Sequence, residues 1–325
     1  MNNKPSISVI MATHSGGPHL PDAINSILNQ TFTDFEFIII NDAAKPETAT
    51  LLSSYNDPRI KILVNSENLG LTKSLNKGLA AAQGEYIARM DADDISLPER
   101  FEVQKKFLDE SPEIAVVGSA TIIIDDTNKE SGSKKPMTDP DLLKFYIQIK
   151  NQITHSSVMF RKNVILEIGG YDESVKYAQD YDLWSRLLHK KIMLSNIEKP
   201  LLKYRFHQKS ITQGATKGKA YESAMKTVYK NMTHYTAISQ EEFEIFAESF
   251  HSHKVPTLRK VIIVQKILSN FVNAYIKKET PSLENTKKIN AYIRREKINS
   301  FKYYAAYRFN LPYRVARSIK RMITK

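Results

Sequence analysis

The first two hundred residues alternate between short apolar runs and amphipathic segments. The first four apolar runs are almost continuous in apolar residues, which favours strands that are covered on both faces. Between them, LPDAINSILNQ, PETATLLSSY and LTKSLNKGLAAAQ have helical spacing. The pattern predicts an α/β domain with a mostly parallel sheet flanked by helices. The six expected strands are SISVIMA from Ser6, FEFIII from Phe35, IKILV from Ile60, EYIARM from Glu85, AVVGSATIII from Ala115 and SSVMF from Ser156.

The pattern changes after about residue 210. ISQEEFEIFAESF opens with a capping box, Ser239 with Glu242, and then places three phenylalanines at helical spacing. From there onward the chain has helical patterns with few strand signals, and prolines mark the expected boundaries at Pro256, Pro281 and Pro312. We therefore expect two domains, an α/β domain over 1–214 and a helical, basic domain over 215–325.

Acidic residues follow two of the expected strands. IIINDA presents Asp42, and IARMDADD presents Asp91 and Asp93. The carboxyl ends of parallel strands open onto one edge of a sheet, so acids about fifty residues apart can share a crevice. An Asp-x-Asp pair lets two carboxylates reach one ion, and oxygen ligands suit Mg²⁺ or Mn²⁺. The alternative is a solvated turn in which Asp91 or Asp94 caps the next segment, and we assign Asp94 to capping.

A further acidic pair lies in KYAQDYDLWSRLLHK. If a helix starts at Asp180, that side chain lies over the apolar face, whereas Asp182 joins Arg186 on the polar face. We expect Asp180 to point inward and Asp182 to point outward. An inward carboxylate is desolvated, which raises its pKa and makes it a better acceptor for a hydroxyl proton. The alternative is that Asp180 is only the N-cap of the helix.

Other polar residues lie where they can line the same crevice. His155 precedes an expected strand in NQITHSSVMFRK, and His207 lies in LLKYRFHQKSIT. Each is either a ligand-facing group or an ordinary structural histidine. Lys73 and Arg89 either face a diphosphate or are solvated surface charges.

Composition and charge narrow the classes of protein to which the chain can belong. The 325 residues, 42% of them hydrophobic, can bury a sizeable core. Cysteine is absent, which excludes disulfides, thiolate catalysis and Cys-ligated zinc. No signal peptide precedes the first strand and no apolar run reaches membrane-spanning length, so we expect a cytoplasmic protein. Of the net charge of +12, +11 follows residue 284, where twelve basic residues are opposed by Glu296 alone.

The ordered motifs resemble a known family. SVIMATHSGGPHLPDAINSILNQTFTDFEFIIINDA is followed by NLGLTKSLNKGLAAAQGEYIARMDADDISLPERFE, HSSVMFRK, GGYDE, AQDYDLWSRL and YRFH. Together they resemble the family 2 glycosyltransferases of bacterial cell-surface glycan synthesis, which are inverting enzymes with the Rossmann-like GT-A fold. The likeness covers about residues 5 to 210.

The resemblance implies roles for individual residues. Thr13 and Asp42 would hold the base of a nucleotide, and Asp91 would lie near its ribose. Asp93 would bind the Mn²⁺ or Mg²⁺ that bridges the diphosphate. Asp180 would be the catalytic base that deprotonates the acceptor hydroxyl.

The resemblance implies roles for five further residues. Asn68, Lys73 and Arg89 join the nucleotide-binding set. His207 in YRFH would lie near the metal or diphosphate, and His155 toward the acceptor pocket. MATHSGG departs from the family's usual first motif, and neither a processive QxxRW element nor membrane helices are found, which favours transfer of a single sugar.

The implied substrates are a nucleotide-sugar, expected to be a UDP-sugar, and a glycan or lipid-linked acceptor. The tail INAYIRREKINSFKYYAAYRFNLPYRVARSIKRMI interleaves basic and aromatic residues, which is typical of attachment to an anionic membrane surface. The alternative for the tail is a helix packed on the catalytic domain with a solvated basic face. Two alternative functions are a sugar nucleotidyltransferase and a nucleic-acid-binding protein that uses the tail. We expect no nucleic-acid partner.

Overall fold

The computed structural model describes residues 4–206, 217–251 and 257–308 of the chain. It divides into two compact units, Met1–Ala224 and Met225–Lys325. The boundary expected at 214/215 lies outside the described residues, and so does His207.

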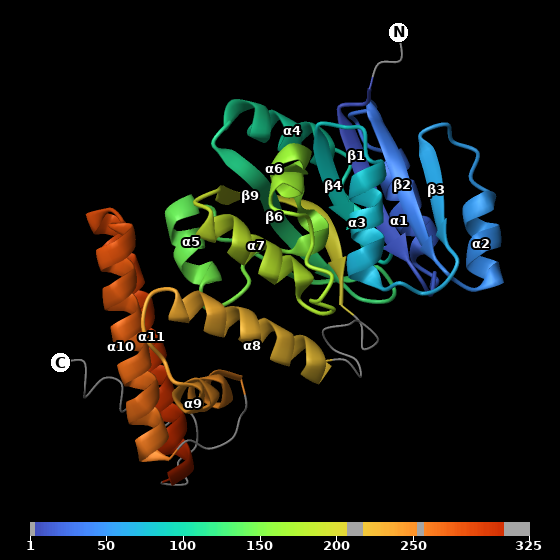
Figure 1. Ribbon diagram of the computed structural model, residues 1–325. Helices are drawn as coiled ribbons and strands as arrows, with labels where there is room; N and C mark the ends of the chain where they lie inside the picture. Colours follow the sequence, from blue (N-terminus) through green and yellow to red (C-terminus); the bar gives the residue numbers. More distant parts are fainter. Residues whose placement is uncertain (1–3, 207–216, 252–256, 309–325) are drawn as a thin grey trace. The chain divides into compact units, whose positions relative to one another are not determined.

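The first unit is built on a nine-stranded sheet in the order β3-β2-β1-β4-β8-β6-β9-β5, with β7 paired to β6 (Figure 1). The strands among the described residues are β1 (Ile7–Thr13), β2 (Phe35–Asp42), β3 (Ile60–Asn65), β4 (Tyr86–Met90), β5 (Ile95–Ser96), β6 (Ile114–Ile124), β7 (Glu130–Lys134), β8 (Met159–Arg161) and β9 (Met193–Arg205). The helices are α1 (Leu20–Leu28), α2 (Pro46–Ser53), α3 (Leu71–Ala81), α4 (Arg100–Glu110), α5 (Pro140–Ile147), α6 (Lys162–Glu167) and α7 (Gln179–His189), with a 3₁₀ turn η1 (His155–Ser157).

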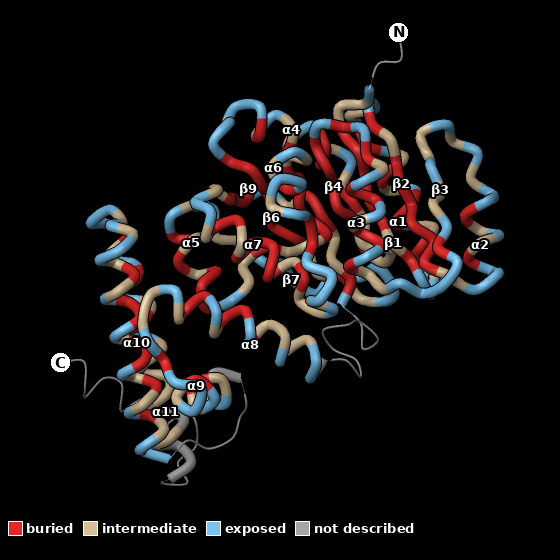
Figure 2. Tube along the Cα trace, viewed as in Figure 1, coloured by how far each residue is buried: buried red, intermediate tan, exposed pale blue. Residues whose placement is uncertain are grey.

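The half of the sheet formed by β3, β2, β1 and β4 is parallel, as the apolar pattern predicts. Strands β1, β2 and β4 are buried on both faces, whereas the edge strand β3 is partly exposed, with Val64 62% exposed. Val9 and Met11 join the core cluster that contains α1, whereas Ile10 faces α3 on the opposite side, where a Cβ on Gly78 would approach it to 2.6 Å. Gly78 therefore lets α3 pack directly on the strands. Figure 2 shows the buried positions concentrated along this sheet.

The other half of the sheet is mixed. Strand β8 runs antiparallel to both β4 and β6, whereas β6 and β9 are parallel. The sheet is therefore less uniformly parallel than the sequence pattern indicates. Three strands, β5, β7 and β9, were not among the expected ones. The expected strand from Ser156 begins as the turn η1 and becomes β8 only at Met159.

The second unit is helical among its described residues. It contains the end of α8 (Lys217–Thr233), α9 (Gln240–His251), α10 (Leu258–Glu279) and α11 (Leu283–Arg308). The predicted capping box is confirmed: the backbone N–H of Ser239 donates to Glu242, and that of Glu242 donates to Ser239 Oγ, each at 3.1 Å. No helix in the described part is both long and apolar enough to cross a membrane.

Candidate active site

The parallel strands bring the predicted acids to one edge of the sheet. Strand β1 pairs with both β2 and β4, and Met11 lies opposite Ile39 on one side and Met90 on the other. The chain therefore leaves β2 and β4 at the same edge. Asp42 ends β2, and the acidic turn, which we define as residues 91–94, follows β4 directly.

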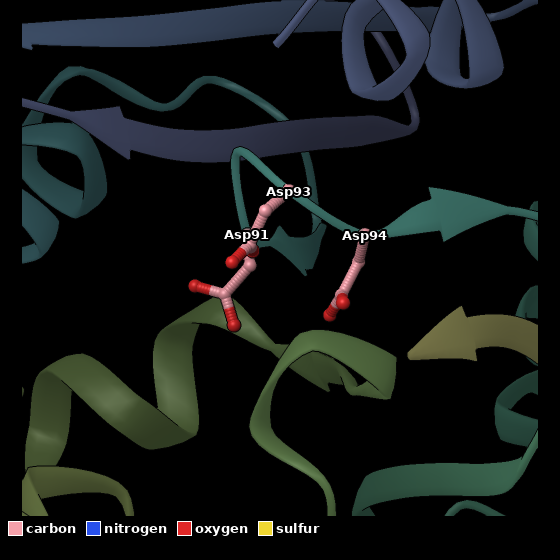
Figure 3. A group of neighbouring side chains, drawn as sticks. All are labelled: Asp91, Asp93 and Asp94. Atoms are coloured by element: carbon pink, nitrogen blue, oxygen red, sulfur yellow. The ribbon is translucent and has the colours of Figure 1, made fainter. Parts of the chain in front are cut away.

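The acidic turn gathers three carboxylates. One oxygen each from Asp91, Asp93 and Asp94 lies within 4.8 Å of the others. Figure 3 shows the three side chains extending to the same side of the turn. Asp91 and Asp93 are half-buried, whereas Asp94 is only 1% exposed. Two of the three carboxylates can therefore be reached from solvent.

The expectation that Asp94 caps the following segment is wrong. Ser156 Oγ donates to one oxygen of Asp94, and the backbone N–H of Arg205 donates to the other at 2.7 Å. Both donors come from distant segments, so the side chain joins parts of the core instead of ending a helix. Burial raises the pKa of Asp94 well above its ordinary value, and the charges of Asp91 and Asp93 add to the effect.

Three buried arginines surround the acidic turn. Arg89 forms an ion pair with Asp91. Arg100 Nη2 donates to the carbonyl of Arg89 at 2.7 Å, and Arg205 Nε donates to the carbonyl of Asp93 at 2.7 Å. Their positive charges oppose the repulsion among the carboxylates. The interpretation of Arg89 as a solvated surface charge is wrong, because it is 2% exposed.

Asp180 lies in the first turn of α7 but does not cap it. The N-cap is Ala178, in a left-handed conformation with φ of 53°. The Asp180 carboxylate accepts a hydrogen bond from Asn151 Nδ2 at 2.8 Å. Burial raises the pKa of Asp180, as the sequence predicts, and the charge of Arg89 partly opposes that rise.

The prediction that Asp182 points outward is wrong. Its side chain is buried and pairs with Arg186 Nε at 2.7 Å. Arg186 also donates to the carbonyls of Ile168 and Gly170, at 3.0 and 2.7 Å. The polar face of α7 therefore packs on the turn at residues 168–170 instead of facing water. Helical periodicity separates the two faces but does not reveal what covers the polar one.

His155 lies between the acidic turn and α7. Its Nε2 is 2.8 Å from the hydroxyl of Tyr171, and its ring packs edge-on against Tyr171 and Trp184. Burial and the charge of Arg89 lower the pKa of His155 well below its usual range, so the imidazole is neutral. The Arg89 charge also acts on Tyr171, Asp91 and Asp180. Arg89 thus links the acidic turn, His155 and Asp180 in one electrostatic cluster.

Asp42 anchors the loop that precedes α3. Its buried carboxylate accepts hydrogen bonds from Asn65 Nδ2 at 2.7 Å and from the backbone N–H groups of Leu69 and Gly70 at 2.8 and 2.9 Å. Gly70, which precedes α3, has φ of 82°, a conformation that glycine adopts without strain. Asp42 therefore fixes the backbone on which Asn68 is carried.

His14 joins the ends of β1 and β2 to that loop. Its Nδ1 lies 2.7 Å from the carbonyl of Asp42, which can only accept, so Nδ1 carries the proton and Nε2 accepts from Asn68 at 3.1 Å. Thr13, also buried, accepts a hydrogen bond from the N–H of Gly16 at 3.2 Å. The structure thus gathers Thr13, Asp42 and Asn68, whereas Lys73 is an exposed side chain in the first turn of α3.

Several known proteins resemble this chain in sequence or in fold. The uncharacterized glycosyltransferase MJ1057 of Methanocaldococcus jannaschii is 35% identical over 72% of this chain and 82% of that protein. The family model for glycosyl transferase family 2 matches residues 8–169. The chain belongs to this family. Because the chain belongs to a family of glycosyltransferases, the two alternative functions, a sugar nucleotidyltransferase and a nucleic-acid-binding protein, are rejected.

Other relatives of this family 2 glycosyltransferase have more specific descriptions. The O-antigen biosynthesis glycosyltransferase WbnJ of Escherichia coli is 35% identical and matches 64% of this chain and 83% of its own length. TarS of S. aureus, solved with UDP-GlcNAc, has a TM-score of 0.62 and 17% identity, over 95% of this chain and 93% of that one. The predicted GT-A fold with a helical C-terminal region is confirmed.

The acidic turn of this glycosyltransferase fits a hard divalent cation. Mg²⁺ and Mn²⁺ are bound by carboxylate oxygens, with water and phosphate completing the coordination. Asp91 and Asp93 offer half-buried carboxylates, and the oxygens of the cluster are close enough to share one ion. Asp94 differs from them in burial, since it is 1% exposed, and each of its oxygens accepts a hydrogen bond from the protein.

The sequence reasoning missed several residues of the site. Arg100, Asn151 and Tyr171 were not candidates, although they contact Arg89, Asp180 and His155, respectively. Arg205 lies in the quoted YRFH motif, and its presence in that motif was the available signal. Ser156 follows His155 directly and was read only as part of a strand.

Proposed function

We propose that this protein is an inverting glycosyltransferase that moves one sugar from a UDP-sugar to a hydroxyl of a glycan or lipid-linked acceptor. The names of its relatives support this class of product, since WbnJ acts in O-antigen biosynthesis and AmsE of Erwinia amylovora in amylovoran biosynthesis. The likeness in fold to TarS, which was solved with UDP and with UDP-GlcNAc, supports a UDP-sugar donor.

The observation that carries the proposal is the half-buried carboxylate of Asp180, which is held by Asn151, has a pKa raised by burial, and feels the charge of the same Arg89 that pairs with Asp91. In the proposed reaction Asp180 accepts the proton of the acceptor hydroxyl. The oxygen then forms a bond to the anomeric carbon from the face opposite the nucleotide, and the bond from that carbon to the diphosphate oxygen breaks. The nucleoside diphosphate leaves with the electron pair, and the configuration inverts.

His155 is proposed to lie on the acceptor side of the reacting atoms. Because the imidazole is neutral and its Nε2 is held by the Tyr171 hydroxyl, it offers a fixed polar surface without adding positive charge beside Asp180. A protonated histidine there would stabilise the ionised form of Asp180 and make it a weaker base.

The nucleotide is proposed to bind at the edge formed by Thr13, Asp42, Asn68, Lys73, Arg89 and Asp91. Asp42 contributes by holding the loop at residues 65–70, because its oxygens are already engaged by that loop. Asn68 projects from this loop, and Lys73 follows it as an exposed cation that can face phosphate. Asp91 is proposed to lie toward the ribose.

Mn²⁺ or Mg²⁺ is the proposed cofactor, held by Asp93 next to Asp91. When bound there, such an ion stabilises negative charge on the departing diphosphate. Arg205 and Arg100 hold the turn in place through the carbonyls of Asp93 and Arg89. His207, the other proposed metal-side residue, lies outside the described residues.

We also propose that the second unit binds an anionic membrane surface at the cytoplasmic face. Ile289 and Ile293 of α11 are buried, whereas Lys287, Lys288, Arg294 and Arg295 are exposed. We call these four cations the basic ridge. Their seven-residue spacing places the two pairs on one side of the helix, two turns apart. Exposed cations of this kind are attracted to anionic headgroups.

A thermal-shift measurement with UDP and Mn²⁺ tests the proposed function. Saturating ligand stabilises a folded protein by about 2.7 kcal/mol at a concentration one hundred times its Kd. We expect a clear rise in Tm for the wild-type protein, its loss in Asp93→Ala, and its retention in Glu113→Ala, which changes an exposed acid before β6. No rise in the wild-type protein, or an equal rise in Asp93→Ala, would contradict the proposal.

A further inference from the structure

Asp94 joins three segments that are far apart in the sequence. It belongs to the acidic turn after β4, it accepts a hydrogen bond from Ser156 in η1, and it accepts another from the backbone of Arg205 at the end of β9. Asp94, Ser156 and Arg205 are all buried, at 1% exposure each. A buried carboxylate with a donor on each oxygen fixes its own backbone relative to both donors.

The Arg205 side chain extends this connection. Its Nε donates to the carbonyl of Asp93 at 2.7 Å, Nη1 donates to the carbonyl of Asp125 at 2.6 Å, and Nη2 donates to Asn128 Oδ1 at 2.6 Å. The peptide group between Asp93 and Asp94 is therefore held from two sides, by the Arg205 guanidinium at the carbonyl and through the Asp94 side chain. This peptide sets the direction in which the Asp93 carboxylate leaves the turn.

We propose that Asp94 is a positioning residue, which acts through Ser156 and Arg205 to aim the carboxylate of Asp93 at the divalent cation, and that it is not itself a metal ligand. The inference rests on the proposed function, because it assigns Asp93 to the metal. The three acids differ in burial: Asp91 and Asp93 are half-buried, whereas Asp94 is 1% exposed and each of its oxygens accepts a hydrogen bond from the protein.

The two roles predict different effects of conservative substitution. In Asp94→Asn the amide oxygen can still accept from the Arg205 N–H, and the amide nitrogen can donate to Ser156 Oγ, so both connections remain. The variant lacks the carboxylate that a ligand would need. Asp94→Ala removes both connections, and Ser156→Ala removes one without altering any acid.

The test is a titration of the full-length protein with Mn²⁺ in the presence of UDP, with the Kd for Mn²⁺ as the readout. We expect Asp94→Asn to stay within about threefold of wild type, and Asp94→Ala and Ser156→Ala to weaken binding by roughly tenfold or more, as losses of supporting contacts around metal sites do. Asp93→Asn should abolish binding. The matched control is Ser195→Ala, which removes a buried serine hydroxyl of β9 that bonds to the carbonyl of Thr138.

Each possible result of the Mn²⁺ titration has a different meaning for Asp94. If Asp94→Asn weakens Mn²⁺ binding as much as Asp93→Asn does, Asp94 is a ligand and the inference is overturned. Wild-type affinity for Mn²⁺ in both Asp94→Ala and Ser156→Ala would overturn the inference as well. The hydrogen bonds of Asp94 would then have no effect on the metal site. No Mn²⁺ binding by the wild-type protein would overturn the proposed metal site itself, and the inference with it. A folded Ser156→Ala variant keeps the test decisive if Asp94→Ala does not fold.

Discussion

The two units of the chain differ in where their charged side chains lie. The first buries charged side chains, including Asp42, Arg89, Asp94, Arg100, Asp182 and Arg205. Among the described residues of the second, the buried polar side chains are the uncharged Thr227, Asn231 and Asn285, and the basic ridge is exposed. Burying a charge is costly unless it is paired and hydrogen-bonded. We infer that the first unit uses its charges for chemistry and the second uses them for surface attraction.

The largest expected effect separates a buried arginine from an exposed one. Arg205→Met leaves the carbonyl of Asp93 without its donor and also removes the hydrogen bonds that the guanidinium donates to Asp125 and Asn128. An unsatisfied polar group costs about 1–3 kcal/mol, and each lost hydrogen bond from a charged group costs about 1.5–3 kcal/mol. Arg294→Met, on the exposed ridge of α11, should change stability by less than about 0.5 kcal/mol. Urea denaturation measures both free energies of unfolding. Equal losses in the two variants would contradict the contrast between the units.

A second comparison concerns two acids on one helix. Asp182→Asn weakens the pair with Arg186 and should lower the free energy of unfolding by about 1–3 kcal/mol. Asp180→Asn should raise it at neutral pH. Because burial raises the pKa of Asp180, the folded protein keeps this proton where the unfolded chain has lost it, so stability falls as pH rises through that interval.

The sign of the Asp180 effect can be checked by pH. Asparagine does not titrate, so the gain in Asp180→Asn should vanish below the unfolded pKa of about 4, where both states of the wild-type protein are protonated. Thermal melts of wild type and variant across this range measure the difference. A gain that persists unchanged at low pH would show that desolvation of the carboxylate is not its cause.

The smallest effect on catalysis is expected from the basic ridge. Replacement of Lys287, Lys288, Arg294 and Arg295 by Gln should reduce sedimentation with anionic liposomes, since each cation near the surface contributes about 1 kcal/mol. Turnover of a water-soluble acceptor should stay unchanged. The control makes the same charge change in the first unit, at the exposed Lys61, Lys106, Lys135 and Lys190. An equal loss of sedimentation in both variants would remove the special role of the ridge.

The parts of the fold that could be predicted are those with strong hydrophobic periodicity. Strands β1, β2 and β4 are buried on both faces, and α1 buries an apolar stripe of Leu20, Ala23, Ile24 and Ile27. Strand β7 is exposed throughout, and β9 is interrupted by Glu198, Lys199 and Pro200 where its register with β6 shifts. Neither has an apolar alternation from which a strand could be predicted.

Local patterns located the acids of the site but not their partners. Asp91, Asp93 and Asp180 could be proposed as site residues because each lies near the start or end of an element. Asp94 and Asp182 could not be assigned correctly, because their partners are contributed by segments whose packing no local pattern reveals. Buried arginines such as Arg205 look like surface residues in a sequence, since arginine is rarely fully buried unless paired.

The central claim is that Asp180 is the catalytic base, and the rate of sugar transfer by the Asp180→Asn variant tests it most directly. With Mn²⁺ and the UDP-sugar that the wild-type protein turns over fastest, we predict unchanged donor affinity and a fall in kcat of about 10²- to 10⁴-fold, the usual contribution of a general base. Asp182→Asn, measured where it remains folded, should keep its kcat. Near-normal turnover by Asp180→Asn would contradict the assignment of Asp180 as the base and the account of the site built on it.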